Sequence, residues 1–246
     1  MNVTRRLAPR TQLTRKPLPI DDPTIARLTA DERRVAGAVW HGRAEAELRA
    51  SGSFEHVAGE LEAAVAPAEL IALARRAVAD ELRHAAICWR VACAFAGATL
   101  PAPRKLPLQI PALAGASEPL RRILHVIGMS CLNETTAGAF LEVCRDGARG
   151  PLVCTALHEL LTDEIDHARL GWAFVATLDA RTHAEVAGWI PKLIAANLGM
   201  WRQRPHRPIT DALVAQGCPR WDDVDAAVVA AIDDLLKPGF ALVGLA

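Results

Sequence analysis

The sequence contains no tyrosine, no C-x-x-C pair and no long uninterrupted apolar run. Without tyrosine, the chain cannot store an oxidising equivalent on a tyrosyl radical. The six cysteines lack paired spacing, which argues against a disulfide framework and against a zinc or rubredoxin-type site. We therefore expect reduced thiols in a cytoplasmic protein. A membrane helix needs about 20 predominantly apolar residues, so we expect no membrane partner.

The charge of the chain is balanced. Its 28 basic and 28 acidic side chains give a formal net charge of zero. No global field therefore draws the protein to nucleic acid or to an anionic membrane. An apolar fraction of 51% over 246 residues is enough for one hydrophobic core, so we expect one domain.

The first 28 residues differ in composition from the rest. They hold several arginines and prolines, and no acidic residue precedes Asp21. Such a segment cannot build a core, so we expect an extended N-terminal arm over 1–28 and a single domain over 29–246. No apolar segment follows Arg5 and Arg6, which argues against a secretory signal. An arginine-rich mitochondrial transit peptide stays open as an alternative.

From Thr29 onward, apolar residues recur at three- and four-residue spacing, and the breaks fall at proline and glycine. This pattern predicts an all-α fold. Four long helices are expected at about 30–64, 67–99, 119–146 and 151–179, and two accessory helices at about 182–203 and 221–236. The proline-rich connection over 100–117 predicts a four-helix bundle with one long crossover, in which the second and third helices lie side by side.

A five-residue motif, D-E-x-x-H, occurs in the second and in the fourth predicted helix, at 80–84 and 163–167. A shuffled chain of this composition would contain it only about 0.03 times, so two copies are a strong signal. Residues three apart project from the same helix face, so the glutamate and histidine of each copy can hold one metal ion. These candidate ligands are Glu81 and His84 in the first copy and Glu164 and His167 in the second.

Both glutamates are predicted to lie on the buried stripe of their helices. The positions one and two turns from Glu81 and from Glu164 are apolar or small. Arg76, Arg83 and Arg90 are predicted on the opposite face of the second helix. Because a buried carboxylate is costly unless it is neutralised, paired or bound to metal, burial favours ligation.

A site of this kind takes one further glutamate from each remaining helix. In the third helix, Glu134 lies among apolar residues on its own face. In the first helix, Glu45 and Glu47 are both candidates, and Glu47 is preferred because it shares a face with Trp40 and Phe54. Four carboxylates and two imidazoles suit two iron or manganese ions better than copper or structural zinc.

Asp80 and Asp163 each directly precede a candidate ligand. We expect each to accept the second N–H of the histidine in the opposite motif, an interaction that fixes the orientation of the imidazole. Four other histidines lack partner spacing and are not expected to bind metal: His41, His56, His125 and His158.

As a set, these residues resemble the ligands of the ferritin-like di-iron carboxylate superfamily. The stretches 40–47, 133–135 and 163–172 look most like a group of bacterial ferritin-like domain proteins of unsettled function. The resemblance covers roughly residues 30–180, the expected bundle core. It implies a ferritin-like bundle with the metal ligands Glu47, Glu81, His84, Glu134, Glu164 and His167. Ribonucleotide reductase small subunits and rubrerythrins resemble the chain less, because the former typically need a radical tyrosine and the latter carry paired C-x-x-C motifs.

The resemblance implies an enzyme, an oxidase or oxygenase with two iron ions, or manganese, and dioxygen as co-substrate. We expect a small apolar organic substrate beside the metals and no catalytic residue beyond the ligands. Gly138, one turn after Glu134, either leaves room there for dioxygen or substrate or marks a close helix contact. No nicotinamide or flavin fingerprint is present, so a separate reductase or ferredoxin is expected to supply electrons.

Three other functions stay open on the sequence. They are a ferroxidase or iron-handling bundle, a manganese catalase-like protein and a non-catalytic helical interaction domain. The sequence is also compatible with a homodimer.

Overall fold

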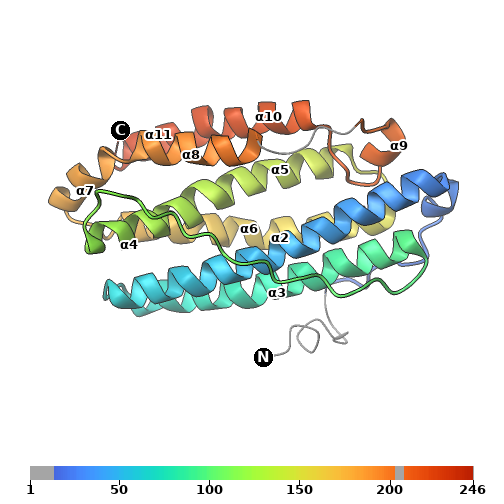
Figure 1. Ribbon diagram of the computed structural model, residues 1–246, viewed down its shortest axis with the longest axis horizontal. Coiled ribbons are helices and arrows are strands. Elements are labelled where there is room, and N and C mark those ends of the chain that lie inside the picture. The colour runs from blue at the N-terminus through green and yellow to red at the C-terminus, as the bar shows by residue number, and fades with distance from the viewer. Residues whose placement is uncertain (1–13, 203–207, 246) are drawn as a thin grey trace.

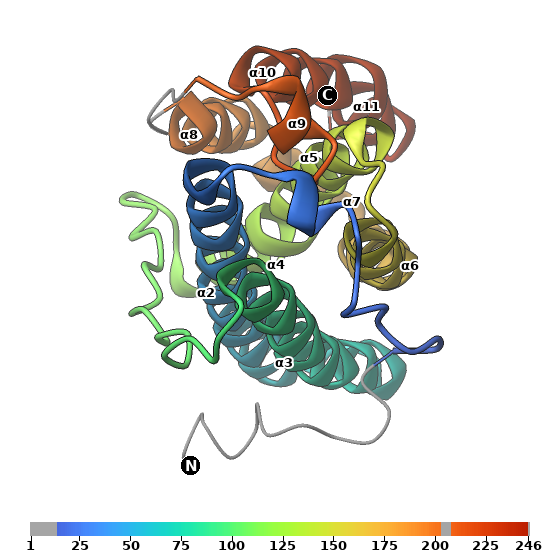
Figure 2. The same ribbon diagram turned by 90° about the vertical axis from the view of Figure 1, so that its right-hand side faces the viewer.

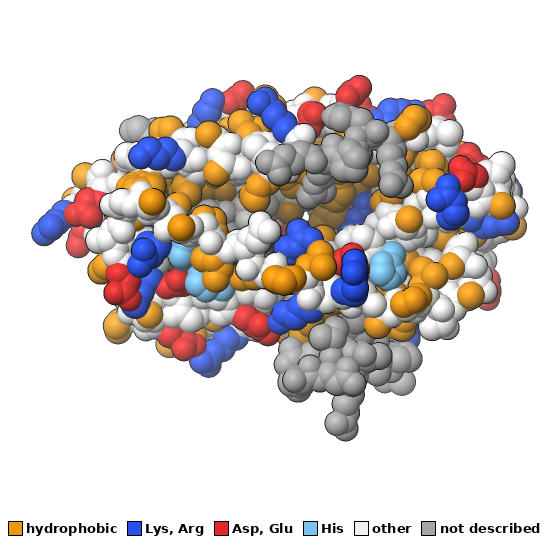
Figure 3. Space-filling view, in the orientation of Figure 1, with side chains coloured by type: hydrophobic (Ala, Val, Ile, Leu, Met, Phe, Trp, Pro, Cys, Tyr) orange, Lys and Arg blue, Asp and Glu red, His pale blue; other side chains and the backbone are white. Residues whose placement is uncertain are grey.

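The computed structural model describes residues 14–202 and 208–245. Within these ranges the regular structure is helical and no residue lies in a β-strand, which confirms the predicted all-α class. No helix in the described part of the chain is both long enough and apolar enough to span a membrane. On the face shown in Figure 3, acidic and basic side chains are interspersed, in keeping with the formal net charge of zero.

Four long helical rods account for most of residues 30–175, and Figure 1 shows how they are arranged. Two of them are α2 (Ala30–Ala63) and α3 (Ala68–Ala96), and a third is α6 (Pro151–Val175). The remaining rod joins α4 (Glu118–Val126), a π-helical segment η2 (Ile127–Asn133) and α5 (Glu134–Gly147). Local chemistry sets the ends: Thr29 and Glu32 form a capping box before α2, and Gly97 ends α3 in the left-handed conformation.

The packing order of the rods differs from the prediction. Helix α2 packs against α3, α3 against α6, α6 against η2 and α5, and α2 against α4. The second and third predicted helices, α3 and the α4–α5 rod, therefore lie diagonally across the group rather than side by side, as the end-on view in Figure 2 shows.

The long connection explains this arrangement. After α3 it runs back along α2 to reach α4 (Figure 1). Arg104 Nε lies 3.2 Å from Glu45 Oε1, and Lys105 Nζ lies 3.1 Å from Glu55 Oε2, so ion pairs fasten the connection to α2. Because the connection passes outside α2, it reaches α4 on the side of the four rods that lies opposite α3.

The C-terminal region is divided more finely than the two predicted helices. Its described segments are α7 (Ala180–Ala187), α8 (Ile190–Arg202), α9 (Asp211–Val214), α10 (Trp221–Ala230), the π-helical η3 (Ala231–Leu236) and α11 (Lys237–Leu242). The helix predicted at 182–203 is interrupted between Ala187 and Ile190, and Pro191 falls in the first turn of α8, where no N–H is needed. Pro238 lies at the start of α11, which directly continues η3. Helix α10 packs against α5.

Part of the predicted N-terminal arm lies against α6. Residues 1–13 of that arm are outside the described residues, and 14–28 contain a short 3₁₀ helix, η1 (Ile25–Arg27). Asp22 accepts a hydrogen bond from the backbone N–H of Leu152 at 2.9 Å, which satisfies a free donor at the start of α6.

Two of the apolar clusters of the core lie mainly within the four rods. One contains Trp40, Leu48 and Leu160, and the other contains Phe54, Ala77 and Leu170. Along α3 and α6, the polar residues of the predicted metal site fall between the positions that build these two clusters, and on α2 Glu47 lies beside Leu48 of the first cluster.

Candidate metal centre

The structure brings all six predicted ligands together between the four rods. Each is buried, as the stripe argument predicted: relative exposure is 1% for Glu81, 6% for Glu164 and 0% for His84. The other three are similarly enclosed: Glu47, Glu134 and His167. So many ionisable groups in one interior are stable only if they neutralise one another or bind cations.

The ligand atoms fall into two groups of four, each with its atoms within 4.8 Å of one another. The His84 group consists of Glu47, Glu81, His84 and Glu164. The His167 group consists of Glu81, Glu134, Glu164 and His167. Each group thus has one histidine and one glutamate of its own, and the two groups share Glu81 and Glu164.

The two shared carboxylates face both groups. Glu81 Oε2 lies 3.5 Å from His84 Nδ1, whereas Glu81 Oε1 lies 3.0 Å from His167 Nδ1. Glu164 is arranged likewise, with Oε1 3.7 Å from His84 Nδ1 and Oε2 3.4 Å from His167 Nδ1. Each shared glutamate therefore presents one oxygen to each group.

The orientation of these atoms fits metal ligation better than hydrogen bonding. Glu81 Oε2, Glu164 Oε2 and the Nδ1 atoms of both histidines are buried without a hydrogen-bond partner, although oxygens lie close to each nitrogen. Buried polar atoms in proteins are normally satisfied, so several orphans in one place need an explanation. Atoms that converge on a shared centre instead of on one another leave room for a cation.

The choice between Glu45 and Glu47 has a geometric answer. Glu47 belongs to the His84 group, whereas Glu45 Oε1 accepts a hydrogen bond from Arg104 Nε in the long connection. Glu45 therefore fastens the connection to α2 and is outside both groups.

Asp163 supports the first histidine across the helix interface. His84 Nε2 donates to Asp163 Oδ2 at 3.1 Å, which leaves Nδ1 facing the cluster. This is the contact expected between opposite motifs. Arg83 and Arg15 also contact the Asp163 carboxylate, the latter at 3.0 Å, so its charge is held in place from three sides. Such partners orient a ligand and raise its basicity.

The placement of Arg83 corrects the prediction that it lies on the face of α3 away from the site. Its side chain reaches Asp163 and also Glu159, where Nη1 lies 3.3 Å from Oε2. Glu159 is buried and also pairs with Arg15, so a four-residue ionic network that helix periodicity does not reveal lies beside the cluster. Arg15 and Glu159 carried no spacing signal, because they meet only when the N-terminal arm lies against α6.

Asp80 stands in the corresponding place for the second histidine, but at greater distance. His167 Nε2 lies 3.8 Å from Asp80 Oδ2, beyond hydrogen-bond length, and has no hydrogen-bond partner. The Phe54 ring lies against the His167 ring with centroids 5.0 Å apart. The two histidines thus have the same sequence motif and different support.

Glu47 and Glu134, the two carboxylates that are not shared between the groups, resist ionisation. Burial and the neighbouring Glu81 raise the pKa of Glu47 well above its ordinary value. Burial and Glu164 do the same to the pKa of Glu134. In the absence of metal, these two glutamates therefore retain protons into a range where an exposed glutamate is ionised.

The pKa values of the shared carboxylate Glu81 and of the two histidines shift so as to favour their charged forms. Burial opposes the ionisation of Glu81, but His167 and His84 outweigh it and lower the pKa of Glu81. Burial opposes a charge on His84 too, yet Asp163 and Glu81 raise its pKa to about 10. The pKa of His167 is raised as well, because Asp80 and Glu164 overcome the effect of burial. Without metal, the imidazoles supply the positive charge.

A π-helical segment directly precedes Glu134. Segment η2 ends at Asn133, and α6 crosses it closely at Gly171. An ideal Cβ on Gly171 would lie 2.5 Å from Cys131 Sγ and 2.7 Å from Cys131 N, so only glycine fits there. Such segments occur frequently at functional sites, and here the close approach brings Glu134 toward the ligands on α6.

Gly138 has open space beside it. A Cβ there would meet nothing within 4 Å, so the interpretation of this glycine as a close helix contact is wrong. Thr136 donates its hydroxyl hydrogen bond to Leu132 O at 2.9 Å, a helix back-bond rather than an interaction with the cluster.

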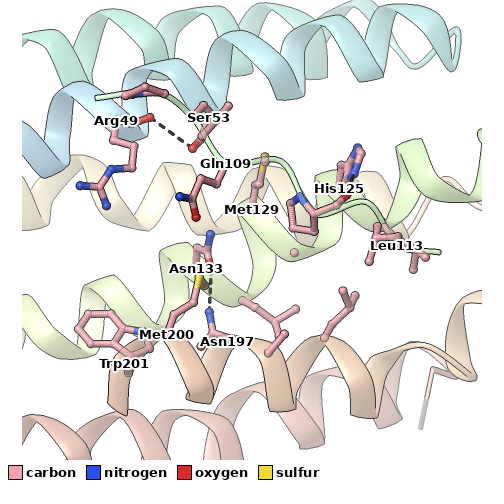
Figure 4. A pocket seen from close by; sticks show the side chains of 18 of the residues that line it. Arg49, Ser53, Gln109, Leu113, His125, Met129, Asn133, Asn197, Met200 and Trp201 are labelled. Carbon is pink, nitrogen blue, oxygen red and sulfur yellow. Dashed lines mark hydrogen bonds between the residues drawn. The ribbon is translucent and has the colours of Figure 1, made fainter. Parts of the chain in front are cut away.

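A cavity of about 760 Å³ lies beside η2, between α2, the long connection and α8. Its lining is largely apolar with a few polar groups, among them Arg49, Asn133 and Asn197 (Figure 4). Asn197 Nδ2 donates to Asn133 Oδ1 at 2.7 Å. A second cavity, of about 500 Å³, is lined by α8 and α11. None of the six predicted ligands lines either of these cavities.

Two of the histidines set aside in the sequence analysis meet in the fold. His56 on α2 and His125 on α4 come together with Glu60 in a third group of ligand-type atoms. Glu60 follows His56 by four residues, so the statement that His56 lacks partner spacing is wrong. The 69-residue separation of the two histidines concealed the rest of the group.

Comparison with known protein families, with curated proteins and with solved structures found no match.

Proposed function

We propose that this chain is a ferritin-like di-iron protein that uses dioxygen to oxidise a small apolar organic substrate. One observation carries the proposal: Glu81 and Glu164 each present one oxygen to His84 and the other to His167. A carboxylate placed in this way can bridge two ions, which favours a dinuclear site over a single ion. Each half is completed by one histidine and one further glutamate.

Charge balance supports two divalent ions. Four carboxylates carry four negative charges, and two neutral imidazoles add none, so two divalent ions neutralise the set. Oxygen-rich ligation with two imidazoles suits iron or manganese. Bound iron would supply electrons to dioxygen, and a separate reductase or ferredoxin would renew them. The apolar clusters on both sides of the site exclude bulk water from it.

A ferroxidase, in which ferrous ion itself is the substrate, is the second candidate. It is favoured by the finding that none of the six ligands lines the cavities beside η2 and α8. An organic substrate must reach the ligands, whereas ferrous ion and dioxygen need far less space.

The test begins with metal analysis of the full chain and of Glu81→Ala and Glu164→Ala. The proteins are reconstituted anaerobically with ferrous ion, and the optical spectrum is recorded when air is admitted. Glu45→Ala is the matched control, because Glu45 lies two residues from Glu47 and outside both groups. Far-UV circular dichroism verifies that each variant is helical.

We expect about two irons per chain in the parent and in the control, loss of both ions in the two variants, and transient absorption on oxygenation. Repeated consumption of ferrous ion without an organic product would select the ferroxidase. Two manganese ions without that absorption would instead favour peroxide disproportionation as the function. A parent that binds no metal, with all variants equally folded, would overturn the proposal and leave a helical interaction domain.

A further inference from the structure

The group of His56, Glu60 and His125 lies outside the six-ligand cluster. His56 follows Glu47 by nine residues on α2, which is roughly 13 Å along the helix. Side-chain exposure is 22% for His56, 14% for Glu60 and 6% for His125, so the group is largely enclosed but reachable from solvent. Its ligand atoms therefore form a site of their own.

Three atoms of this group form a nearly equilateral triangle. His56 Nε2 lies 3.1 Å from Glu60 Oε1, His125 Nδ1 lies 3.0 Å from the same oxygen, and the two nitrogens lie 3.3 Å apart. Donor atoms bound to one tetrahedral Zn²⁺ at about 2.0–2.1 Å lie roughly 3.3 Å apart. The triangle thus has close to the size of one face of such a coordination sphere.

The Nε2 atom of His125 already has a hydrogen-bond partner. His125 Nε2 donates to the backbone carbonyl of Pro111 at 2.9 Å. In the neutral ring this leaves Nδ1 as a lone pair directed toward His56 and Glu60. A histidine that ligates metal almost always donates its other N–H to a carbonyl or a carboxylate, and Pro111 fulfils that role here.

The carboxylate is oriented by an arginine. Arg122 Nε lies 3.6 Å from Glu60 Oε2, while Oε1 faces the histidines. Glu118 also pairs with Arg122, which offsets part of the positive charge near the group. Burial lowers the pKa of His56, so its imidazole is neutral and can donate a lone pair near neutral pH.

Hydrogen bonding alone leaves one contact unexplained. The single proton on His56 Nε2 can serve either Glu60 Oε1 or His125 Nδ1. If Pro111 accepts the only proton of His125, the lone pairs of His125 Nδ1 and Glu60 Oε1 face each other at 3.0 Å. Either a second proton on His125 or a cation within the triangle removes this repulsion.

We propose that His56, Glu60 and His125 bind one divalent transition-metal ion of the zinc type, separate from the two ions of the central cluster. Two imidazoles and one carboxylate are a known zinc ligand set, and three protein ligands leave the fourth position to water. The ion would join α2 to α4 and, through Pro111, to the long connection. His125 also lines the large cavity, where Figure 4 places it toward the Leu113 end and away from Trp201.

The experiment uses Zn²⁺ as the probe and the full chain throughout. Metal-free protein is loaded with zinc and dialysed, and the zinc content per chain is measured in the parent, His56→Gln and Glu60→Gln. His41→Gln is the matched control, because His41 lies on the same helix and its Nε2 also contacts a carbonyl of the long connection, that of Pro101. All variants are repeated in the Glu81→Ala background, which disables the central cluster.

We expect His56→Gln and Glu60→Gln to hold one zinc fewer than the parent, and His41→Gln to match the parent. In the Glu81→Ala background, about one zinc should remain, and each of the two substitutions should weaken its binding at least tenfold. Replacement of zinc by Co²⁺ should give visible bands typical of tetrahedral coordination, which disappear in the same variants.

The proposal is overturned if both variants keep the zinc content and cobalt spectrum of the parent, or if the Glu81→Ala protein binds no zinc while it remains folded. The group then holds a second proton instead of an ion. Two variants are used so that a folding defect in one, detected by circular dichroism, leaves the other to decide. Because the Glu81→Ala background separates the two sites, this result is independent of whether the central cluster binds iron.

Discussion

The His84 group and the His167 group contain the same kinds of ligand but have different neighbours. His84 donates to Asp163, which Arg83 and Arg15 hold from outside. His167 stands 3.8 Å from Asp80, beside the Phe54 ring and next to the π-helical segment. A repeated motif thus brings the same types of ligand to both groups, but the distance from the motif aspartate to the opposite histidine differs between them.

The largest expected effect comes from the two aspartates. Asp163→Asn removes a charged acceptor from His84 and should weaken metal binding in the His84 group by about tenfold to a hundredfold. Asp80→Asn should cost less, because no hydrogen bond joins Asp80 to His167. Titration of ferrous ion against a competing chelator measures both. Equal losses of affinity in the two variants would show that Asp80 and Asp163 support their histidines to the same degree and would contradict the difference between the two groups.

The next effect concerns the packing of the His167 group. Gly171→Ala places a methyl group against Cys131 in η2 and should destabilise the fold by about 1–3 kcal/mol. Urea unfolding of the metal-free protein measures the loss. In the metal-loaded protein, the ion of the His167 group should be released first on chelation. Unchanged stability would mean that η2 yields easily and does not fix Glu134.

The two groups should agree in their response to pH. The pKa values of Glu47 and Glu134 are raised, and the pKa of His84 is raised to about 10. A raised folded-state pKa stabilises the fold below the unfolded value and loses that stability as pH rises. The metal-free protein should therefore lose thermal stability as the pH rises from about 4.5, the ordinary pKa of glutamate, toward about 10.

Metal binding should reverse this trend, because ligation requires Nδ1 of each histidine without a proton. Calorimetric titration in two buffers of different ionisation enthalpy should show protons released as ferrous ion binds at neutral pH. Binding without proton release would contradict the raised pKa values. Glu81 and Asp163 act in the opposite sense, since their lowered pKa values affect stability only in acid.

The smallest effect is a gain. Gly138→Ala adds a methyl group where nothing lies within 4 Å, so the lower backbone entropy of the unfolded chain should stabilise the fold by about 0.5–1 kcal/mol. Both this change and Gly171→Ala replace a glycine near the His167 group, but only the methyl group at position 171 collides with a neighbour. If that open space admits dioxygen, oxidation of bound iron should slow in this variant while stability rises.

Much of the candidate site could be predicted because its signal is local. Helix periodicity placed Glu81 and Glu164 on the buried stripe, and the structure confirms their burial. The contact from Asp163 to His84 followed from the pairing of two motifs. Each of these inferences needs only the geometry of one helix and the fact that two such helices face each other.

The rest depends on contacts between distant segments. Arg83 points toward the site because it forms ion pairs with Glu159 and Asp163 on α6. Periodicity within α3 alone predicted that its side chain points outward. The diagonal placement of α3 and the α4–α5 rod goes with the path of the long connection along α2, which no local pattern in the sequence specifies. The contact between His56 on α2 and His125 on α4 likewise depends on where the long connection brings α4.

The π-helical turn before Glu134 also constrains how this chain can change. An α-helix turns by about 100° per residue, so loss of one residue within α6 would swing its later side chains away from their partners. Segment η2 has wider turns, which accommodate more residues than a regular helix of the same length. A single deletion there can be absorbed by a return to α-helical winding, with α4 and α5 still in phase. Length variation in this rod is therefore expected to be tolerated at 127–133 and nowhere else near the ligands.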